Sequence, residues 1–313
     1  MAENVLGIDI GGTNITFGII HSSGDIIYKN SFKTAHFSSP DDFVKALYLH
    51  FQETDYLPTL KGIGIGAPNG NFYHGSIDFA PNMPWKGKIL LCQMFEAQFK
   101  IRAVLSNDAN AAAIGEKIFG AGKEFKNFVL ITLGTGLGSG VIINGELLLG
   151  TNGYAGEYGH IRVVKDGRAC KCGRRGCLET YASATGVMKT YEEYKASFPH
   201  SSLASYDTVN SKVIFDEAKI GDELANKIVD FTADILGDSL ADFACFSDPQ
   251  AFILFGGITH SGDDFIDKVS QAMNANLLNI FKDKIVVKRT ALEGDVSPLL
   301  GAAAVFLSTE NKH

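Results

Sequence analysis

The sequence predicts an α/β fold of two similar domains that face each other across a ligand-binding cleft. The chain has 313 residues, 45% of them hydrophobic, which is enough to bury one large or two medium cores. It also contains an internal repeat: residues 6–20 (LGIDIGGTNITFGII) and 129–143 (VLITLGTGLGSGVII) align without a gap. Each copy is typical of an apolar strand, a glycine-rich turn and a second apolar strand, so each half is expected to offer one glycine turn to the same ligand.

The remaining elements follow from local patterns. In the first half we expect a third strand at 26–33, a helix at 40–51, strands at 60–66 and 101–106, and an alanine-rich helix at 108–119 that Gly120 ends. In the second half we expect helices at 184–196 and 222–246, a buried strand at 251–255 and a short apolar helix at 298–307. The predicted smaller domain comprises residues 1–118 and 298–313, and the larger one residues 119–297.

Composition excludes several classes of protein. With 28 Lys and Arg against 35 Asp and Glu, the net charge is −7, so we expect no nucleic-acid partner. The first ten residues lack a secretion signal, and glycines interrupt the longest uncharged stretch, residues 127–145. We therefore expect a cytoplasmic protein with no membrane partner. The 34 glycines come with only 8 prolines and no collagen-like period, which predicts that the surplus lies in particular loops.

The glycine turns are not of the common nucleotide-binding types. A dinucleotide fingerprint requires its glycines to open a helix, whereas β-branched and aromatic residues follow both turns here. No phosphate loop of the G-x-x-x-x-G-K-[ST] kind occurs in the chain. Free N–H groups in such turns still suit phosphate oxygens.

Asp9 ends the first apolar strand, immediately before Gly11, Gly12, Thr13 and Asn14. One interpretation is a turn capped by Asp9 and Asn14. The other is a carboxylate that holds hydrated Mg²⁺ beside triphosphate oxygens cradled by the turn, and the repeated turn at Gly134, Thr135 and Gly136 favours it.

Asn107 and Asp108 lie where a buried strand gives way to a helix. An ordinary helix N-cap explains them, with a contribution of about 1 kcal/mol. A carboxylate at the end of a strand facing a cleft is also where a general base for a substrate hydroxyl belongs. Phosphoryl transfer tolerates a weak base, because the hydroxyl needs orientation more than early deprotonation.

Four residues predict a zinc site: His160, Cys170, Cys172 and Cys177. One imidazole and three thiolates complete a tetrahedron, so the site is expected to be closed and structural. Its loop carries Glu157 and Glu179, two carboxylates able to grip adjacent sugar hydroxyls. The same region is basic, which is typical of a solvated surface or of a phosphate or partner site; its cations are Lys165, Arg168, Lys171, Arg174 and Arg175. For Cys92 and Cys245 we expect no role beyond packing.

These segments together carry a resemblance. The chain resembles the ROK family (repressor, open reading frame, kinase), and within it the bacterial glucokinases; the matching motifs are Asp9–Asn14, Asn107–Ala113, Leu133–Gly136, Gly156–His160 and Cys170–Glu179. The resemblance implies an actin-like, ribonuclease-H-like fold of two domains with ATP and sugar in the cleft. It also implies a homodimer or a higher homo-oligomer.

The resemblance further implies roles for individual residues. Asp108 is the expected base for the sugar 6-hydroxyl, and His160 is expected to bind both zinc and sugar. The expected sugar contacts are Asn82, Asn107, Asp108, Glu157, His160 and Glu179, and those of ATP and Mg²⁺ are Asp9, Gly11, Gly12, Thr13, Asn14, Gly134, Thr135, Gly136, Gly256 and Gly257. The chain departs from the family pattern at Ile258, where a third glycine is common, and at Met83 and Lys86.

The predicted activity is ATP-dependent phosphorylation of glucose at O6, with Mg²⁺ and a structural Zn²⁺. The alternatives are a kinase for mannose, fructose, allose, N-acetylglucosamine or N-acetylmannosamine, and a catalytically silent sugar sensor, which the presence of both Asp9 and Asp108 disfavours. A sugar-responsive ROK repressor is a rival of another class. It requires a helix-turn-helix ahead of the core, and only eight residues precede Asp9.

Overall fold

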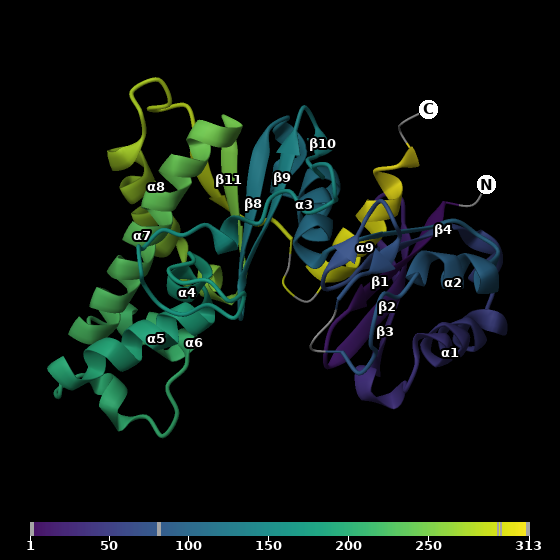
Figure 1. Cartoon of the computed structure of the whole chain (residues 1–313), viewed down its shortest axis with the longest axis horizontal. Coiled ribbons are helices and arrows are strands. Elements are labelled where there is room, and N and C mark those ends of the chain that lie inside the picture. The colour runs from purple at the N-terminus through teal and green to yellow at the C-terminus, as the bar shows by residue number, and fades with distance from the viewer. Residues whose placement is uncertain (1–2, 80–82, 293, 295, 311–313) are drawn as a thin grey trace. The chain divides into compact units, whose positions relative to one another are not determined.

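The structure, a computed structural model, describes residues 3–79, 83–292, 294 and 296–310. The chain divides into two compact units. Unit 1 comprises the described residues up to Glu124, the segment Leu147–Ala155 and the described residues from Ala291 onward; unit 2 comprises Phe125–Glu146 and Gly156–Thr290. Each unit is built on a five-stranded mixed sheet (Figure 1).

These divisions differ from the predicted boundaries at 118/119 and 297/298. Residues 121–124 stay with unit 1 because the N–H of Ala121 donates to a carboxylate oxygen of Glu116 at 2.7 Å. Leu292 joins the same unit through its apolar core. The sequence contains no pattern that predicts the return of residues 147–155 to unit 1.

The sheet of unit 1 has the strand order β3-β2-β1-β4-β7. Strand β1 pairs antiparallel with β2 and parallel with β4, and β7 lies parallel to β4. The strands are β1 (Asn4–Ile10), β2 (Asn14–His21), β3 (Ile26–Lys33), β4 (Leu60–Gly66) and β7 (Ala103–Ser106), and a small hairpin is formed by β5 (Gly70–Asn71) and β6 (Ser76–Ile77). The parallel strands end at one edge, so Asp9, Gly66 and Ser106 lie side by side.

Helices cover both faces of this sheet (Figure 1). Alternate residues of β1 point to opposite faces: Leu6 and Ile8 pack with α1 (Pro40–Gln52) and α2 (Leu91–Phe99). Val5 packs on the other face with α3 (Asp108–Phe119) and α9 (Ser297–Leu307). The loop that joins strand β7 to α3 therefore emerges at the edge where Asp9 lies.

Close packing of α9 accounts for glycines inside strands. A Cβ at Gly64 would lie 2.0 Å from the carbonyl oxygen of Ala302, and one at Gly7 would lie 2.9 Å from that of Leu299. The prediction that the glycine surplus lies in loops is thus wrong for these positions. Strands β1 and β4 use glycine because the helix backbone approaches the sheet too closely for any side chain.

Unit 2 repeats the topology, with the strand order β10-β9-β8-β11-β12. Its strands are β8 (Phe128–Leu133), β9 (Leu137–Ile143), β10 (Glu146–Leu147), β11 (Ala251–Phe255) and β12 (Val286–Arg289). Its helices are α4 (Glu179–Ala182), α5 (Ala184–Tyr194), α6 (Ser211–Lys219), α7 (Glu223–Ser247) and α8 (Asp263–Asn276). The long helix α7 is the centre of the packing, since α5, α6 and α8 all contact it.

The internal repeat is confirmed at the level of topology. In each unit the first copy strand is central, the second pairs antiparallel with it, and a parallel strand lies on its other side. The predicted α/β fold with two similar units is therefore confirmed. Among the described residues, no helix has both the length and the apolar character needed to cross a bilayer.

Candidate functional site

Asp9 is the next-to-last residue of β1, and its side chain is partly buried. Its neighbours across the sheet are Thr16 and Gly66, and a Cβ at Gly66 would lie 3.6 Å from a carboxylate oxygen of Asp9. Burial, with a smaller contribution from the nearby charge of Asp108, raises the pKa of Asp9 to about 7. A divalent cation would stabilise the ionised form of Asp9, and carboxylate oxygens are the ligands that Mg²⁺ prefers.

The first glycine turn follows Asp9 and is closed by a hydrogen bond from the N–H of Gly11 to the carbonyl of Asn14 at 2.9 Å. Thr34 braces it, donating its hydroxyl to the carbonyl of Gly11 at 2.7 Å and its N–H to that of Thr13 at 3.0 Å. Lys33 donates to the side-chain oxygen of Asn14 at 2.9 Å. Gly12, Thr13 and Asn14 are exposed, so a rigid and accessible turn lies beside a lysine.

Thr34 and Lys33 belong to none of the sequence motifs. Lys33 is the last residue of β3 and Thr34 follows it directly, and no motif around them indicates a ligand. The antiparallel pairing of β2 with β3 places Asn14 opposite Lys33. Only this pairing of the two strands indicates that Lys33 and Thr34 lie beside the turn.

Asn107 and Asp108 lie at the start of α3. The side-chain oxygen of Asn107 accepts the N–H of Asn110 at 2.6 Å, so the N-cap interpretation holds for this residue. Asp108 is exposed, and one of its carboxylate oxygens accepts the N–H of Ala109 at 2.8 Å. The cap thus fixes the backbone while the carboxylate of Asp108 remains accessible.

The second glycine turn joins β8 to β9 in unit 2. The N–H of Gly134 donates to the carbonyl of Gly136 at 3.0 Å, much as Gly11 closes the first turn. The start of α5 braces the turn: Ala184 donates its N–H to the carbonyl of Gly134 at 2.9 Å, and Thr185 its hydroxyl to that of Thr135 at 2.7 Å. Both copies of the repeat therefore present a glycine turn held by a neighbouring element.

Glu179, at the start of α4, connects this turn with the cysteine loop. One carboxylate oxygen accepts the N–H of Leu137 at 3.1 Å, directly after the turn. The other lies 3.7 Å from the sulfur of Cys170. A Cβ at Gly136 would lie 2.4 Å from the first oxygen, so glycine at this position leaves room for the carboxylate.

His160 and the three cysteines Cys170, Cys172 and Cys177 come together, with one ligand atom from each within 4.8 Å of all the others. The sulfur of Cys170 lies 3.7 Å from Nδ1 of His160, and the sulfurs of Cys172 and Cys177 are also 3.7 Å apart. In a zinc tetrahedron with Zn–S bonds of about 2.3 Å, two sulfurs are about 3.8 Å apart. The donor set and its spacing therefore fit zinc.

Short-range backbone contacts shape this loop. The N–H of Cys170 donates to the carbonyl of Arg174 at 2.9 Å, and isolated bridges join Arg162 to Cys177 and Ala169 to Arg175. Burial raises the pKa of the Cys170 thiol to about 12. Zinc would bind it as the thiolate and release the proton.

Glu157 is exposed and lies just before the short 3-10 helix Tyr158–His160. Ser139 of β9 holds the backbone on both sides of it: the Ser139 hydroxyl donates to the carbonyl of Gly156 and accepts the N–H of Tyr158 at 3.0 Å. A Cβ at Gly159 would lie 2.0 Å from the carbonyl of Leu137, so this segment lies directly against β9. Ser139, like Thr34 and Lys33, is not among the predicted site residues.

Gly256 and Gly257 follow β11, which pairs with β8. Gly256 has a φ of 127°, and a Cβ on it would lie 2.4 Å from the carbonyl of Leu133, the residue before the second glycine turn. The two glycines therefore lie next to that turn. Ile258 is buried in the core of unit 2, so the departure from a third glycine serves packing.

Arg168 is structural and not part of a free basic surface. Its guanidinium donates to the carbonyl of Thr180 at 2.8 Å and to Glu193 at 2.8 Å, and it lies over the ring of Tyr181 at 4.5 Å. The other cations of the loop are exposed; they are Lys165, Lys171, Arg174 and Arg175.

The structure thus gathers the predicted residues in two groups. Unit 1 contains Asp9, the first glycine turn, Asn107 and Asp108, whereas unit 2 contains the second turn, the cysteine cluster, Glu157, Glu179 and the glycines after β11. Asn82, a predicted sugar contact, lies outside the described residues.

Comparisons with known proteins find relatives that match nearly the whole chain. The chain is 35% identical to a glucokinase of Halalkalibacterium halodurans over 325 residues, covering 98% of this chain and 96% of the relative. It is 32% identical to a glucokinase of Thermotoga maritima, covering 96% of each. A xylose repressor of Bacillus subtilis is 28% identical, over 96% of this chain and 76% of the repressor.

Solved structures give the same result. A ROK family glucokinase from Streptomyces griseus, in complex with glucose and AMPPNP, matches with a TM-score of 0.78 and 33% identity over 96% of this chain and 98% of the other. A ROK hexokinase from Thermus thermophilus matches with a TM-score of 0.82 and 27% identity over 98% and 99%. The ROK family profile matches residues 5–309, and the chain belongs to this family.

Proposed function

We propose that this protein is an ATP-dependent glucokinase that transfers the γ-phosphate of ATP to the 6-hydroxyl of glucose. The observation that carries the proposal is an exposed carboxylate, Asp108, on the cap of a helix in a chain that is 35% identical to a glucokinase over nearly its whole length. The Streptomyces griseus relative was solved with glucose and AMPPNP, an ATP analogue.

Asp108 is the proposed general base. Its carboxylate accepts the proton of the 6-hydroxyl as the oxygen attacks the γ-phosphorus and the bond to the leaving ADP oxygen breaks. Because the transition state of phosphoryl transfer is loose, the main task of Asp108 is to orient the hydroxyl. The N-cap formed by Asn107 holds the backbone from which Asp108 projects.

The sugar contacts are proposed to be Asn82, Asn107, Glu157, His160 and Glu179. Carboxylates accept hydrogen bonds from sugar hydroxyls, and charge-assisted bonds of this kind are stronger than neutral ones. Ser139 holds the backbone on both sides of Glu157, and Glu179 accepts the N–H of Leu137. His160 would bind zinc through one ring nitrogen and reach the sugar with the other.

The glycine turns are proposed to hold the nucleotide. Gly11–Asn14 and Gly134–Gly136 would donate N–H groups to phosphate oxygens, and Gly256 and Gly257 would lie against the nucleoside. Asp9 would hold Mg²⁺, which neutralises phosphate charge when bound. Zinc would be structural, since three thiolates and an imidazole complete its coordination.

Two further expectations are part of the proposal. We infer a cytoplasmic protein that forms a homodimer or a higher homo-oligomer, as the family resemblance implies. Analytical ultracentrifugation measures the mass of the particle directly, and a monomer at every concentration contradicts the oligomer.

A substrate panel tests the activity. ADP formation is measured with Mg²⁺-ATP and glucose, mannose, fructose, allose, N-acetylglucosamine or N-acetylmannosamine, each with the Asp108→Asn variant as a control for contaminating kinases. We expect the highest kcat/KM with glucose. A higher value for another sugar reassigns the substrate, and no turnover with any of them contradicts a sugar kinase and leaves the sensor or repressor functions.

A further inference from the structure

Residues 147–155 form a segment, here called the strap, between two parts of unit 2 that itself packs in unit 1. The chain leaves the second sheet at β10 (Glu146–Leu147) and re-enters unit 2 at Gly156. The next residue is Glu157, a proposed sugar contact. The strap therefore leads directly into the sugar-binding segment.

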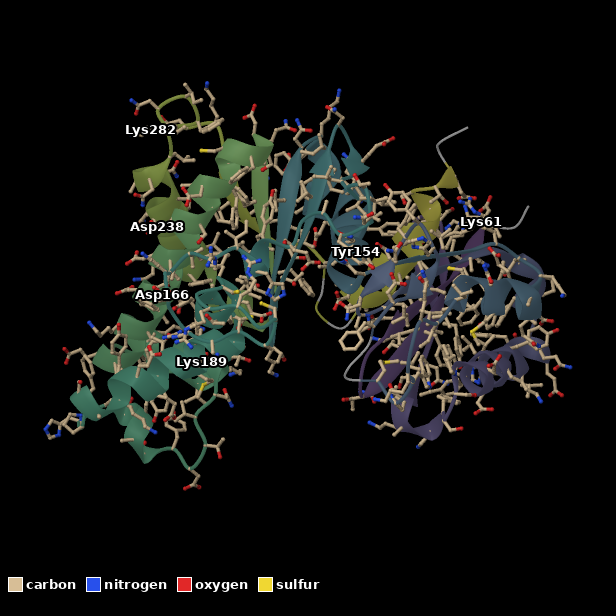
Figure 2. All side chains as sticks on the ribbon, in the orientation of Figure 1. Lys61, Tyr154, Asp166, Lys189, Asp238 and Lys282 are labelled. Atoms are coloured by element: carbon tan, nitrogen blue, oxygen red, sulfur yellow. The ribbon has the colours of Figure 1, made fainter. Side chains whose placement is uncertain are left out.

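Three hydrogen bonds tie the strap to the β5–β6 hairpin and its flanks. The amide of Asn71 donates to the carbonyl of Asn152 at 3.0 Å, and the hydroxyl of Tyr73 donates to that of Gly150 at 2.9 Å. The hydroxyl of Tyr154 donates to a carboxylate oxygen of Asp78 at 2.5 Å (Tyr154 is labelled in Figure 2). The strap is thus fastened near its middle and near its end.

The side chain of Asn71 is buried and bonds both to the hairpin and to the strap. It is 1% exposed, and its side-chain oxygen accepts the N–H groups of Tyr73 at 3.1 Å and His74 at 3.2 Å. Gly153 has a φ of 84° and brings the strap so close that a Cβ would lie 3.3 Å from this oxygen. One buried amide therefore shapes the hairpin and holds the strap.

The bond between Tyr154 and Asp78 is charge-assisted. Asp78 also accepts the hydroxyl of Ser76 at 2.6 Å, and Lys88 lies 3.5 Å away. Burial acts to raise the pKa of Asp78, but the hydrogen bonds of Ser76 and Tyr154 and the charge of Lys88 outweigh it, so the pKa lies below its ordinary value. Ionised acceptors make the stronger hydrogen bonds.

Beyond Tyr154 the chain is short. Only Ala155 and Gly156 separate Tyr154 from Glu157, and three residues of chain span at most about 10 Å. Gly156 has a φ of 90°, a conformation that favours glycine, and Ser139 holds the backbone on either side of Glu157. Glu157 consequently follows the strap within three residues of Tyr154, and Ser139 of unit 2 holds the backbone on both sides of it.

We propose that Tyr154 and Asp78 are positioning residues for Glu157, and that the strap sets the affinity for the sugar. The inference rests on the proposed function, since it takes Glu157 as a sugar contact. Without the Tyr154 hydroxyl the end of the strap is released and Glu157 gains freedom, so glucose binding weakens. The glycine turns that would hold ATP have their own braces at Thr34 and Thr185 and are unaffected.

The test compares Tyr154→Phe and Asp78→Asn with the unaltered protein. We expect the KM for glucose to rise roughly three- to thirtyfold, which corresponds to part or all of a charge-assisted hydrogen bond. The kcat and the KM for ATP stay within about twofold, and the double variant behaves like either single one. Hydrogen exchange of residues 147–156 becomes faster in both variants.

Tyr206 provides a matched control. Its hydroxyl donates to Glu217 at 2.5 Å, and its exposure, 43%, is close to the 46% of Tyr154. Tyr206→Phe therefore removes the same kind of bond away from the strap. We expect it to leave the KM for glucose and the exchange of the strap unchanged.

The outcomes separate the two proposals. An unaltered KM for glucose in Tyr154→Phe, or an equal change in Tyr206→Phe, overturns the positioning role. If the unaltered protein does not phosphorylate glucose, the proposed substrate is wrong, and the same comparison is made with the panel sugar of highest kcat/KM. Unchanged hydrogen exchange of the strap in Tyr154→Phe overturns the positioning role independently of activity.

Discussion

Glu179 accepts the backbone N–H of Leu137 at 3.1 Å, across 42 residues of sequence. The contact joins the first residue after the second glycine turn to the helix that follows the cysteine cluster. The other oxygen of the same carboxylate lies 3.7 Å from the sulfur of Cys170. The side chain of Glu179 thus contacts both the proposed zinc site and the proposed phosphate site, and a shift of one is expected to move the other.

Gly136→Ala is expected to disturb this arrangement, because the new Cβ would lie 2.4 Å from the Glu179 oxygen. Displacement of the turn raises the KM for ATP, by about 5- to 150-fold if about 1–3 kcal/mol of binding free energy is lost. Steady-state kinetics at saturating glucose measures the effect. Gly134→Ala is the matched control, since its Cβ meets nothing closer than 4.0 Å; an equal effect of both variants would count against the steric explanation.

Asp108→Asn is expected to lower kcat by about 10²–10⁴-fold, the usual contribution of a general base. Glucose binding, measured by calorimetry, changes little, because asparagine keeps the shape of the side chain and the oxygen that accepts the N–H of Ala109. A kcat close to that of the unaltered enzyme would remove Asp108 from the role of base.

Asp9 makes the stability of the protein depend on pH. Its pKa is raised from 3.8 to about 7 in the folded state, so the folded protein holds a proton that the unfolded chain has lost between pH 4 and 7. Stability is therefore lost as pH rises through this window. Asp9→Asn removes the cost of ionising a buried carboxylate in the folded state. The free energy of unfolding of this variant should exceed that of the unaltered protein by up to about 4 kcal/mol at pH 8, with little difference at pH 4.

Urea unfolding from pH 4 to 8 measures the difference, and Asp207→Asn, at an exposed position, controls for the loss of one charge. Addition of Mg²⁺ at pH 8 is expected to reduce the difference in free energy of unfolding between Asp9→Asn and the unaltered protein, because a bound cation stabilises the ionised carboxylate. A difference that is constant with pH would show that Asp9 is not the titrating group.

Zinc binding is expected to depend on the cysteine cluster. We expect one zinc ion per chain by elemental analysis, and expect Cys172→Ser to lose most of it together with thermal stability and turnover, because the loop then lacks its fourth ligand. Cys245→Ser is the control: this cysteine is also exposed but lies outside the cluster. Full zinc occupancy in Cys172→Ser would contradict the proposed coordination.

Much of the fold is predictable because local chemistry specifies it. Strands β3, β4 and β11 and helix α3 lie at the residues expected, since apolar runs, the N-cap at Asn107 and Gly120 mark their limits. Helix α2 shows the opposite case: Leu90 precedes it without a capping hydrogen bond, so the sequence contains no start signal. Its apolar face, with Phe95, is stabilised by packing against α1.

The residues of the candidate site likewise fall into those that the sequence predicts and those that it does not. Asp9, Asp108 and the cysteine cluster are predictable, because turns, caps and ligand spacing are local patterns. Thr34, Ser139 and the strap are not, because their roles arise from hydrogen bonds between segments distant in the sequence. The interior glycines of β1 and β4 are a related case, since their requirement appears only when α9 is packed on the sheet.

The packing of α9 also governs when unit 1 can finish folding. Its residues Leu299, Ala302 and Ala303 are fully buried on the sheet formed by strands from the first third of the chain. A nascent chain on the ribosome therefore presents that sheet with the part of one apolar face that α9 covers still exposed, until residues 297–307 have emerged. Until then the uncovered face is a surface that chaperones can bind, and unit 2, whose residues all precede Ala291, is able to complete its core first.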